Sequence, residues 1–399
     1  MLVVVVALLL GTATAQFDVY WNVPTFMCHK HGVFVNASRF GILQNEGDHF
    51  RGNVMVILYD PGLFPAYLTD EPQEEGIYES IFGKQQYSVV ARNGGLPQKG
   101  NLTLHLEAMR NTINELIPNP MFSGAAVIDF ESWRPTYRQN WASLNIYRDK
   151  SKAQARQDHP FWSKESIENE AEKQFERYGR LFMEHTLAVA KDMRPRAKWG
   201  YYAFPYCYNY TPKNKGFDCP SEVKNENNAL NWLYAGSDAL YPSLYMSRQK
   251  LIPEQHFKFV YGRVNEAKRL ANRIKPKRPD VLPYVWYRYY DENEYLTTDD
   301  VYNCVGGPRT LGVRGVVLWG SAKDVNTKDK CLRFERFVQE VLGPVVEHVK
   351  TAPVQEIEKR LTSRRRRASL LNVDWKALFL DPIANILHKK TKQAIPNRQ

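Results

Sequence analysis

The sequence predicts an α/β fold, a distorted (β/α) barrel of about seven parallel strands. Short and almost wholly apolar runs recur along the chain, which is typical of parallel strands that are buried on both faces. Amphipathic stretches separate these runs over about 330 residues, as expected of strand–helix alternation. Polar and aromatic residues follow several of the apolar runs. In barrels of this class that end of the strands carries the chemistry.

Each predicted element corresponds to one such run. The predicted strands are 17–23, 54–60, 125–131, 198–206, 239–246, 281–289 and 315–321. The predicted helices are 102–117, 163–192, 256–274 and 329–349. The helix at 163–192 has the clearest pattern, because Phe175, Tyr178, Phe182 and Val189 recur at helical spacing.

Three segments are expected along the 399 residues, a length that suffices for one large barrel or for two ordinary domains. Residues 1–15 hold a short apolar run that ends in small residues at Ala13 and Ala15, and they predict a secretory signal peptide. The run is too short for a convincing membrane span, and no later run in the sequence is long enough for one. Residues 16–350 form the predicted barrel.

Residues 351–399 are predicted to be a mobile basic tail. They contain 11 Lys and Arg against 4 Asp and Glu, so they contribute +7 of the formal net charge of +11. Four adjacent arginines, Arg364 to Arg367, are expected to be exposed and sensitive to proteases, since like charges repel. Because nucleic acid is a poor partner for a secreted protein, the charge indicates polyanionic glycans or cell surfaces instead.

Cysteines and glycosylation sequons agree with a secretory route. Five cysteines in an oxidising compartment predict two disulfides and one thiol, and Cys207 with Cys219 would close a short loop. The Cys28-His29-Lys30-His31 segment matches no common zinc-ligand spacing, so no metal site is predicted. The predicted glycosylation sites are Asn36, Asn101 and Asn209.

Asp129 and Glu131 directly follow a buried apolar run. Alternate strand residues share a face, so both carboxylates point the same way and Phe130 points opposite. Carboxylates that share a face raise each other's pKa. Two interpretations are open here: two surface acids with arginine partners such as Arg134, or the acid pair of a glycoside hydrolase. Their Cα spacing of about 6.6–6.8 Å does not decide between retention and inversion.

The segment VIDFESWRPTYRQNW, which contains both acids, resembles the catalytic strand of the hyaluronidases, a glycoside hydrolase family of insect venoms and mammalian sperm. Other similar segments lie before and after it in the family's order, over about residues 17–350. They are YWNVPTFMC, NGGLPQ, WGYYAFPYCYNY, ALYPSLYM, GRVNEA, LPYVWY and LWGSAKDVNTKDKC. The insect forms resemble this sequence most, because no cysteine-rich module follows its barrel region.

The resemblance implies a secreted monomeric enzyme that cleaves hyaluronan internally at its N-acetylglucosaminide bond, with no metal or other cofactor. It also implies that the substrate's own acetamido oxygen is the nucleophile, so that no glycosyl-enzyme ester forms. Glu131 matches the family's proton donor. Asp129 matches the acid that orients the acetamido group, and an ionised Asp129 would keep Glu131 protonated to higher pH.

Further site residues follow from the same matches. The implied substrate-binding residues are Tyr202, Tyr245, Trp319, Arg134, Arg263, Tyr284 and Ser321. For the two arginines, holding the acids in place and contacting the substrate are both open. A strand-end Tyr284 or Ser321 is more often structural. The resemblance pairs Cys28 with Cys331 and Cys207 with Cys219, and it leaves Cys304 without a partner.

Two alternatives to a hyaluronan-cleaving enzyme remain open. The first is a catalytically inactive homologue that only binds hyaluronan, which the presence of both acids disfavours. The second is an enzyme of the same chemistry that prefers chondroitin. The sequence does not rank the two glycans.

Overall fold

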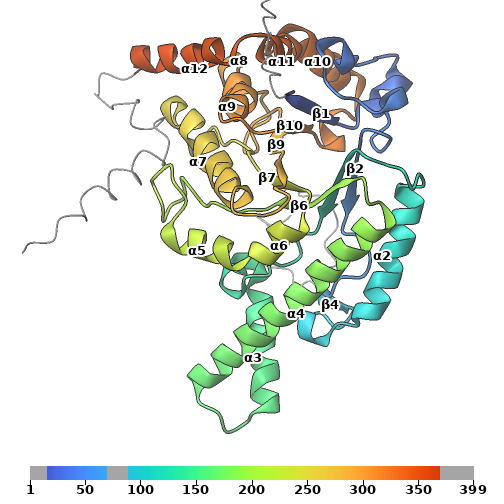
Figure 1. Ribbon diagram of the computed structural model, residues 1–399, viewed down its shortest axis with the longest axis vertical. Coiled ribbons are helices and arrows are strands. Elements are labelled where there is room, and N and C mark those ends of the chain that lie inside the picture. Colours follow the sequence, from blue (N-terminus) through green and yellow to red (C-terminus); the bar gives the residue numbers. More distant parts are fainter. Residues whose placement is uncertain (1–15, 70–88, 369–399) are drawn as a thin grey trace, which may run out of the picture.

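The computed structural model describes residues 16–69 and 89–368. The strands of the barrel run parallel in two ladders (Figure 1). One ladder has the order β1-β10-β9, with β1 at Asp18–Asn22, β10 at Gly315–Trp319 and β9 at Tyr284–Trp286. The other has the order β2-β5-β6-β7-β8, with β2 at Met55–Tyr59, β5 at Ala125–Asp129, β6 at Lys198–Ala203, β7 at Ala239–Pro242 and β8 at Asp280–Val281.

The two ladders close into a barrel. A bridge joins Ser243, just after β7, to Tyr284 of β9, and β1 lies against β2. Among the described residues, no hydrogen-bonded ladder joins β1 to β2 or β8 to β9, so the ring of strands is interrupted at two places. The predicted fold class is therefore confirmed.

The apolar runs form strands because both of their faces are buried. Inside the barrel, one apolar cluster contains Met55, Ile57, Val127, Tyr241 and Val317. The alternate residues, among them Val56 and Ile128, face outward and belong to the larger core beneath the helices. A strand that is buried on both faces has no polar side, which explains the continuous apolar runs.

All four predicted helices are present. They are α2 (Leu102–Leu116), α4 (Lys164–Met193), α7 (Pro253–Ala271), and the α10 (Lys328–Phe337) and α11 (Gly343–Thr351) pair. The side chains of Asn101 and Ser163 cap the first turns of α2 and α4. Elements that were not predicted are α3 (Asn145–Asp158), α5 (Ser221–Ala229), α6 (Asn231–Gly236), α8 (Thr298–Val301), α9 (Gly307–Thr310) and the antiparallel strands β3 (Ala66–Thr69) and β4 (Val89–Arg92).

Helix α3 and the first turns of α4 form a hairpin that projects from the barrel (Figure 1). Further along α4, Phe175 and Phe182 bind it to the barrel through ring contacts with Trp133 and Phe64, which lie just beyond strands β5 and β2. The part of α4 before Phe175 therefore extends past the carboxyl ends of these strands.

The first part of the segment that was predicted to be a tail is a packed helix. Helix α12 (Val354–Ala368) packs on the barrel domain, where Ile357 and Leu361 are buried. The guanidinium of Arg360 lies 3.9 Å from the ring centroid of Tyr302. The domain boundary at residue 350 is thus too early, because an apolar i, i+4 pair fixes this helix. The side chains of Arg364 to Arg367 and all of residues 369–399 lie outside the described part, as does the predicted signal peptide 1–15.

Both predicted disulfides are present. Cys28 and Cys331 join the 3-10 helix after β1 to α10, with 5.6 Å between their Cα atoms and a sequence separation of 303. Cys207 and Cys219 close a local loop with a Cα–Cα distance of 4.7 Å. Cys304 is a buried free thiol, as expected.

The three sequons differ in their surroundings. Asn36 and Asn101 are exposed, and each caps a helix through its side-chain oxygen. Asn209 is only 1% exposed, and its amide nitrogen donates hydrogen bonds to the backbone oxygens of Phe217 and Phe259. This fold leaves no room for a glycan on Asn209, so that part of the prediction is wrong.

Candidate active site

The carboxylate pair lies at the carboxyl end of β5. Asp129 is the last residue of the strand and is partly buried, whereas Glu131 lies two residues further on and solvent reaches it. On the neighbouring strand Tyr59 pairs in register with Asp129, and the next residue, Asp60, donates its backbone N–H to Asp129 O. The oxygen Oδ1 of Asp129 is buried and has no hydrogen-bond partner among the described residues.

Both carboxyl groups have a raised pKa. Burial is the largest cause of the rise at Asp129, to about 7, and the neighbouring charges of Glu131 and Asp60 add to it. Burial also raises the pKa of Glu131, while the charge of Arg134 opposes the rise. The pair therefore keeps a proton near neutral pH. The expectation of an ionised Asp129 beside a protonated Glu131 is too simple for the free protein, because Asp129 itself binds a proton in this range.

Three aromatic rings, those of Tyr202, Tyr245 and Trp319, form a wall beside the carboxylate pair. The ring of Tyr245 stacks on Trp319 at a centroid distance of 5.5 Å and lies 6.0 Å from Tyr202. The indole of Trp286 meets Trp319 edge-on at 5.1 Å. The Nε1 of Trp319 donates to the hydroxyl of Tyr59 over 3.0 Å, which ties the wall to β2. Rings fixed on several strands in this way offer a flat apolar surface for stacking.

Tyr284 lies beneath this wall rather than on it. Its side chain is fully buried inside the barrel, and its ring meets Tyr202 edge-on at 5.1 Å. Its hydroxyl donates to Asn22 Oδ1 on β1. Tyr284 therefore supports Tyr202 from below.

The two predicted arginines occupy different surroundings. The guanidinium of Arg134 lies over Trp141 and Tyr206, at 5.5 and 5.1 Å from their ring centroids. Its charge opposes the rise in the pKa of Glu131. Arg263 reaches in from α7 and donates to Asn209 Oδ1 over 3.0 Å and to the backbone oxygen of Ser243 over 2.8 Å. Within the described residues no ion pair joins Arg263 to an acid. Its contacts are to amide and carbonyl groups and to the ring of Phe259, whose centroid lies 4.2 Å from the guanidinium.

Ser321 follows β10 and caps the short helix that begins at Ala322. Its hydroxyl accepts the N–H of Lys323, and its own N–H donates to Asp324. The structure thus gives Ser321 a capping role next to the wall.

Sequence reasoning missed Trp286 and Asp324. Trp286 lies two residues after Tyr284 in the predicted strand, and same-face alternation would have assigned it to the site. Asp324 gave no comparable signal, because three of its four donors, Trp286, Tyr287 and Arg288, come from one segment 36–38 residues away in sequence. The fourth donor is the backbone N–H of Ser321.

Neither a metal cluster nor a membrane-spanning helix occurs in the part of the chain that the structure describes. Residues 16–69 and 89–368 hold no group of three or more His, Cys, Asp or Glu side chains arranged for a metal ion. No helix in these ranges combines the length and hydropathy that crossing a bilayer requires.

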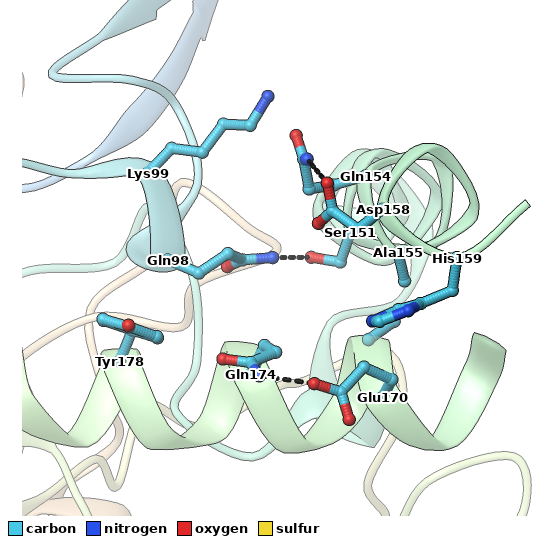
Figure 2. Close-up of a pocket in the computed structure, with 11 residues that line it drawn as sticks. Gln98, Lys99, Ser151, Gln154, Ala155, Asp158, His159, Glu170, Gln174 and Tyr178 are labelled. Atoms are coloured by element: carbon cyan, nitrogen blue, oxygen red, sulfur yellow. Dashed lines mark hydrogen bonds between the residues drawn. The ribbon is translucent and has the colours of Figure 1, made fainter. Parts of the chain in front are cut away.

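A cavity of about 290 Å³ lies away from the acids, between the α3–α4 hairpin and the 3-10 turn Pro97–Lys99 (Figure 2). Its polar side chains largely satisfy one another: Gln98 donates to Ser151, and Gln154 donates to Asp158. None of the predicted site residues lines it. The chemistry therefore belongs to the strand ends and not to this cavity.

A barrel that presents two carboxyl groups of raised pKa beside stacked aromatic rings, at the carboxyl ends of its strands, has the equipment of a glycoside hydrolase. Comparison with known proteins narrows this class. The family model described as hyaluronidase matches residues 11–369. The chain therefore belongs to the hyaluronidase family.

Individual relatives agree with this assignment. The hyaluronidase of Apis mellifera is 47% identical over 337 residues, which cover 84% of each chain. That of Vespa magnifica is 44% identical over 338 residues, which cover 84% of this chain and 90% of the relative. The crystal structure of bee venom hyaluronidase in complex with a hyaluronic acid tetramer superposes with a TM-score of 0.78, covering 84% of this chain and 99% of that one.

Proposed function

We propose that this chain is a secreted enzyme that hydrolyses hyaluronan internally, with retention of configuration, by substrate-assisted catalysis. The observation that carries the proposal is the carboxylate pair at the end of β5, with both pKa values raised, in a member of the hyaluronidase family. A relative that is 47% identical has been crystallised with a hyaluronic acid tetramer, which supports the same substrate here.

Glu131 acts as the general acid. The residue is exposed beyond the end of β5, where a bound polymer can reach it. Partial burial of its carboxyl group raises the pKa in the direction that a proton donor requires. In the first step Glu131 protonates the glycosidic oxygen while the acetamido oxygen of the substrate attacks the anomeric carbon. In the second step Glu131, now ionised, accepts a proton from the water that opens the oxazolinium-like intermediate. Two inversions give net retention.

Asp129 orients the acetamido group. Its unpartnered Oδ1 is a buried acceptor suited to the acetamido N–H. A hydrogen bond to the ionised form lowers the pKa of a carboxyl group, and so does the positive charge that develops on the acetamido group. Substrate binding therefore favours ionised Asp129 and transfers the proton of the pair to Glu131, which is the arrangement that the reaction needs.

The aromatic wall holds the sugar at the pair. Tyr202, Tyr245 and Trp319 form the pocket for the N-acetyl sugar, and Arg134 near Glu131 binds the polyanion. Arg263, Tyr284 and Ser321 support the site: Tyr284 packs against Tyr202, Arg263 holds the backbone of Ser243, and Ser321 binds Asp324. The enzyme works as a monomer without a cofactor, and exposed Asn36 and Asn101 carry glycans.

The experiment is digestion of purified hyaluronan and of chondroitin by the full-length protein, with sizing of the products. An endo-acting enzyme shortens the polymer rapidly before small oligosaccharides accumulate. The anomeric configuration of the first product, followed by NMR, tests retention. Binding of hyaluronan without cleavage would show an inactive homologue, faster cleavage of chondroitin would reassign the substrate, and an inverted first product would exclude substrate assistance.

A further inference from the structure

Asp324 is a buried carboxylate that lies behind the aromatic wall. Its side chain is only 4% exposed. Oδ2 accepts hydrogen bonds from Trp286 Nε1 at 2.9 Å, from the Tyr287 hydroxyl at 3.1 Å and from the backbone N–H of Ser321 at 3.1 Å. Arg288 donates to Oδ1 and neutralises the charge. A buried carboxylate with this many donors fixes the groups that point at it.

The donors Trp286 and Tyr287 come from opposite faces of the chain that leaves β9. Trp286 points toward the site, where it packs against Trp319 at 5.1 Å and Tyr245 at 5.6 Å. Tyr287 points outward into the helix layer, where its ring lies 4.4 Å from Phe334. Trp286 and Tyr287 thus both donate to Oδ2 of Asp324, and of the two only Trp286 packs against the wall.

The contacts continue from Asp324 to the site. The guanidinium of Arg288 lies 5.5 Å from the ring centroid of Trp286, so the indole is held both by its N–H and from its face. The indole edge then limits how Trp319 and Tyr245 can move. An aromatic ring without such a polar anchor keeps its packing area but loses its fixed orientation.

We propose that Asp324 is a positioning residue for hyaluronan cleavage, acting through Trp286 on the Tyr245–Trp319 wall. This inference rests on the proposed function, since the substrate is the sugar that the wall holds. Asp324 does not touch the substrate. It sets the angle of the indole and thereby the width of the space in which the N-acetyl sugar binds.

The test uses three single variants and one double variant of the full-length protein. Asp324→Asn keeps the shape and removes the charge. Trp286→Phe keeps a ring and removes the N–H donor. Tyr287→Phe is the matched control, because it removes a hydrogen bond to the same oxygen on the side away from the wall. The readouts are kcat and KM with hyaluronan, tryptophan emission, and the melting temperature.

We expect Asp324→Asn and Trp286→Phe each to lower kcat/KM roughly tenfold, mainly through KM, as loss of a hydrogen bond to a charged group allows. The double variant combines Asp324→Asn with Trp286→Phe. Its kcat/KM should be no lower than that of the poorer single variant, because both substitutions break the same contact. Asp324→Asn should change the tryptophan emission. Tyr287→Phe should lower the melting temperature and leave both kcat/KM and the emission unchanged.

Three results would overturn the proposal: wild-type kcat/KM and emission in Asp324→Asn, an additive double variant, or an equal loss of kcat/KM in Tyr287→Phe. If Asp324→Asn does not fold, Trp286→Phe decides by the same kinetic criterion. A wild-type protein that does not cleave hyaluronan would refute the proposed function instead. The change in tryptophan emission between Asp324→Asn and Tyr287→Phe would still report on positioning.

Discussion

Strand β5 passes through two regions of opposite character. Its first four residues, Ala125–Ile128, are completely buried, and Val127 packs among apolar side chains inside the barrel. One residue further on, Asp129 has a buried oxygen without a partner and a pKa raised to about 7. The apolar residues inside the barrel stabilise the fold, whereas the acid at the strand end does not. Buried unpaired polar groups cost free energy and persist where function needs them.

The largest effect is expected at the strand end, on activity alone. Glu131→Gln keeps the shape of the side chain but cannot protonate the leaving oxygen, so hyaluronan cleavage should fall by roughly 10²–10⁴-fold. Because burial raises the pKa of Glu131, its charge does not stabilise the fold, and the substitution should not lower the melting temperature. Viscometric assays beside thermal melts check both statements. A variant with near-normal rates would remove Glu131 from the role of proton donor.

The interior should show the opposite pattern. Ile57 is 1% exposed, and Ile57→Ala should lower the free energy of unfolding by about 2–5 kcal/mol through lost burial and a residual cavity. The folded fraction should retain its kcat/KM. Ile252→Ala is the matched control, because that side chain is 58% exposed and its loss should cost less than about 0.5 kcal/mol. Denaturant unfolding measures both variants. Equal losses would mean that the barrel interior is no better packed than the surface.

The two regions also differ in how far the sequence predicts them. Most interior strands were predicted correctly, because continuous burial on both faces produces runs such as those in β2 and β10. The predicted strand 281–289 is the exception, since the structure divides it between β8 and β9 in different ladders. Helix α3 was missed, since its polar composition hides the few positions that pack, among them Tyr147 and Ala155. Helix α12 was missed for a similar reason: its many charges mask the buried pair Ile357 and Leu361.

At the site, the sequence identified residue types but not their long-range partners. Asp129 and Glu131 follow one strand, so local alternation suffices to place them together. The burial of Asn209 depends instead on Phe259, which lies 50 residues away on α7, and no local pattern reveals it. The protonation of the pair likewise depends on Asp60 of the neighbouring strand end, which shifts the pKa of Asp129 upward.

A third prediction measures what the strand end costs in stability. The pKa of Asp129 is about 7 in the folded protein, against about 3.9 for an unperturbed Asp, so the folded state binds a proton that the unfolded state releases. The contribution of Asp129 to wild-type stability should therefore be lost as pH rises from about 4 to about 7. Asp129→Asn removes this dependence.

Asp129→Asn should consequently melt higher than the wild type at about pH 8 and lose that advantage at about pH 4, where Asp129 is protonated anyway. Cleavage of hyaluronan should be impaired at every pH. Asp192→Asn, at the far end of α4, controls for the loss of one surface charge. A difference in melting temperature that stays constant with pH would show that Asp129 is not the group that destabilises the strand end.

The smallest effect concerns Asp60, which is exposed, pairs with Arg92, and raises the pKa of Asp129 after burial and Glu131. Asp60→Asn removes a negative charge and should lower the pKa of Asp129. The basic limb of kcat/KM against pH should then move down by less than about one pH unit. Arg92→Gln should move the limb the other way, because it leaves Asp60 without its counter-charge. Asp192→Asn should not move it. If Asp60→Asn and Arg92→Gln shift the basic limb in the same direction, they act through local structure and not through the charge of Asp60. In that case the charge at the end of β2 does not set the pKa of Asp129.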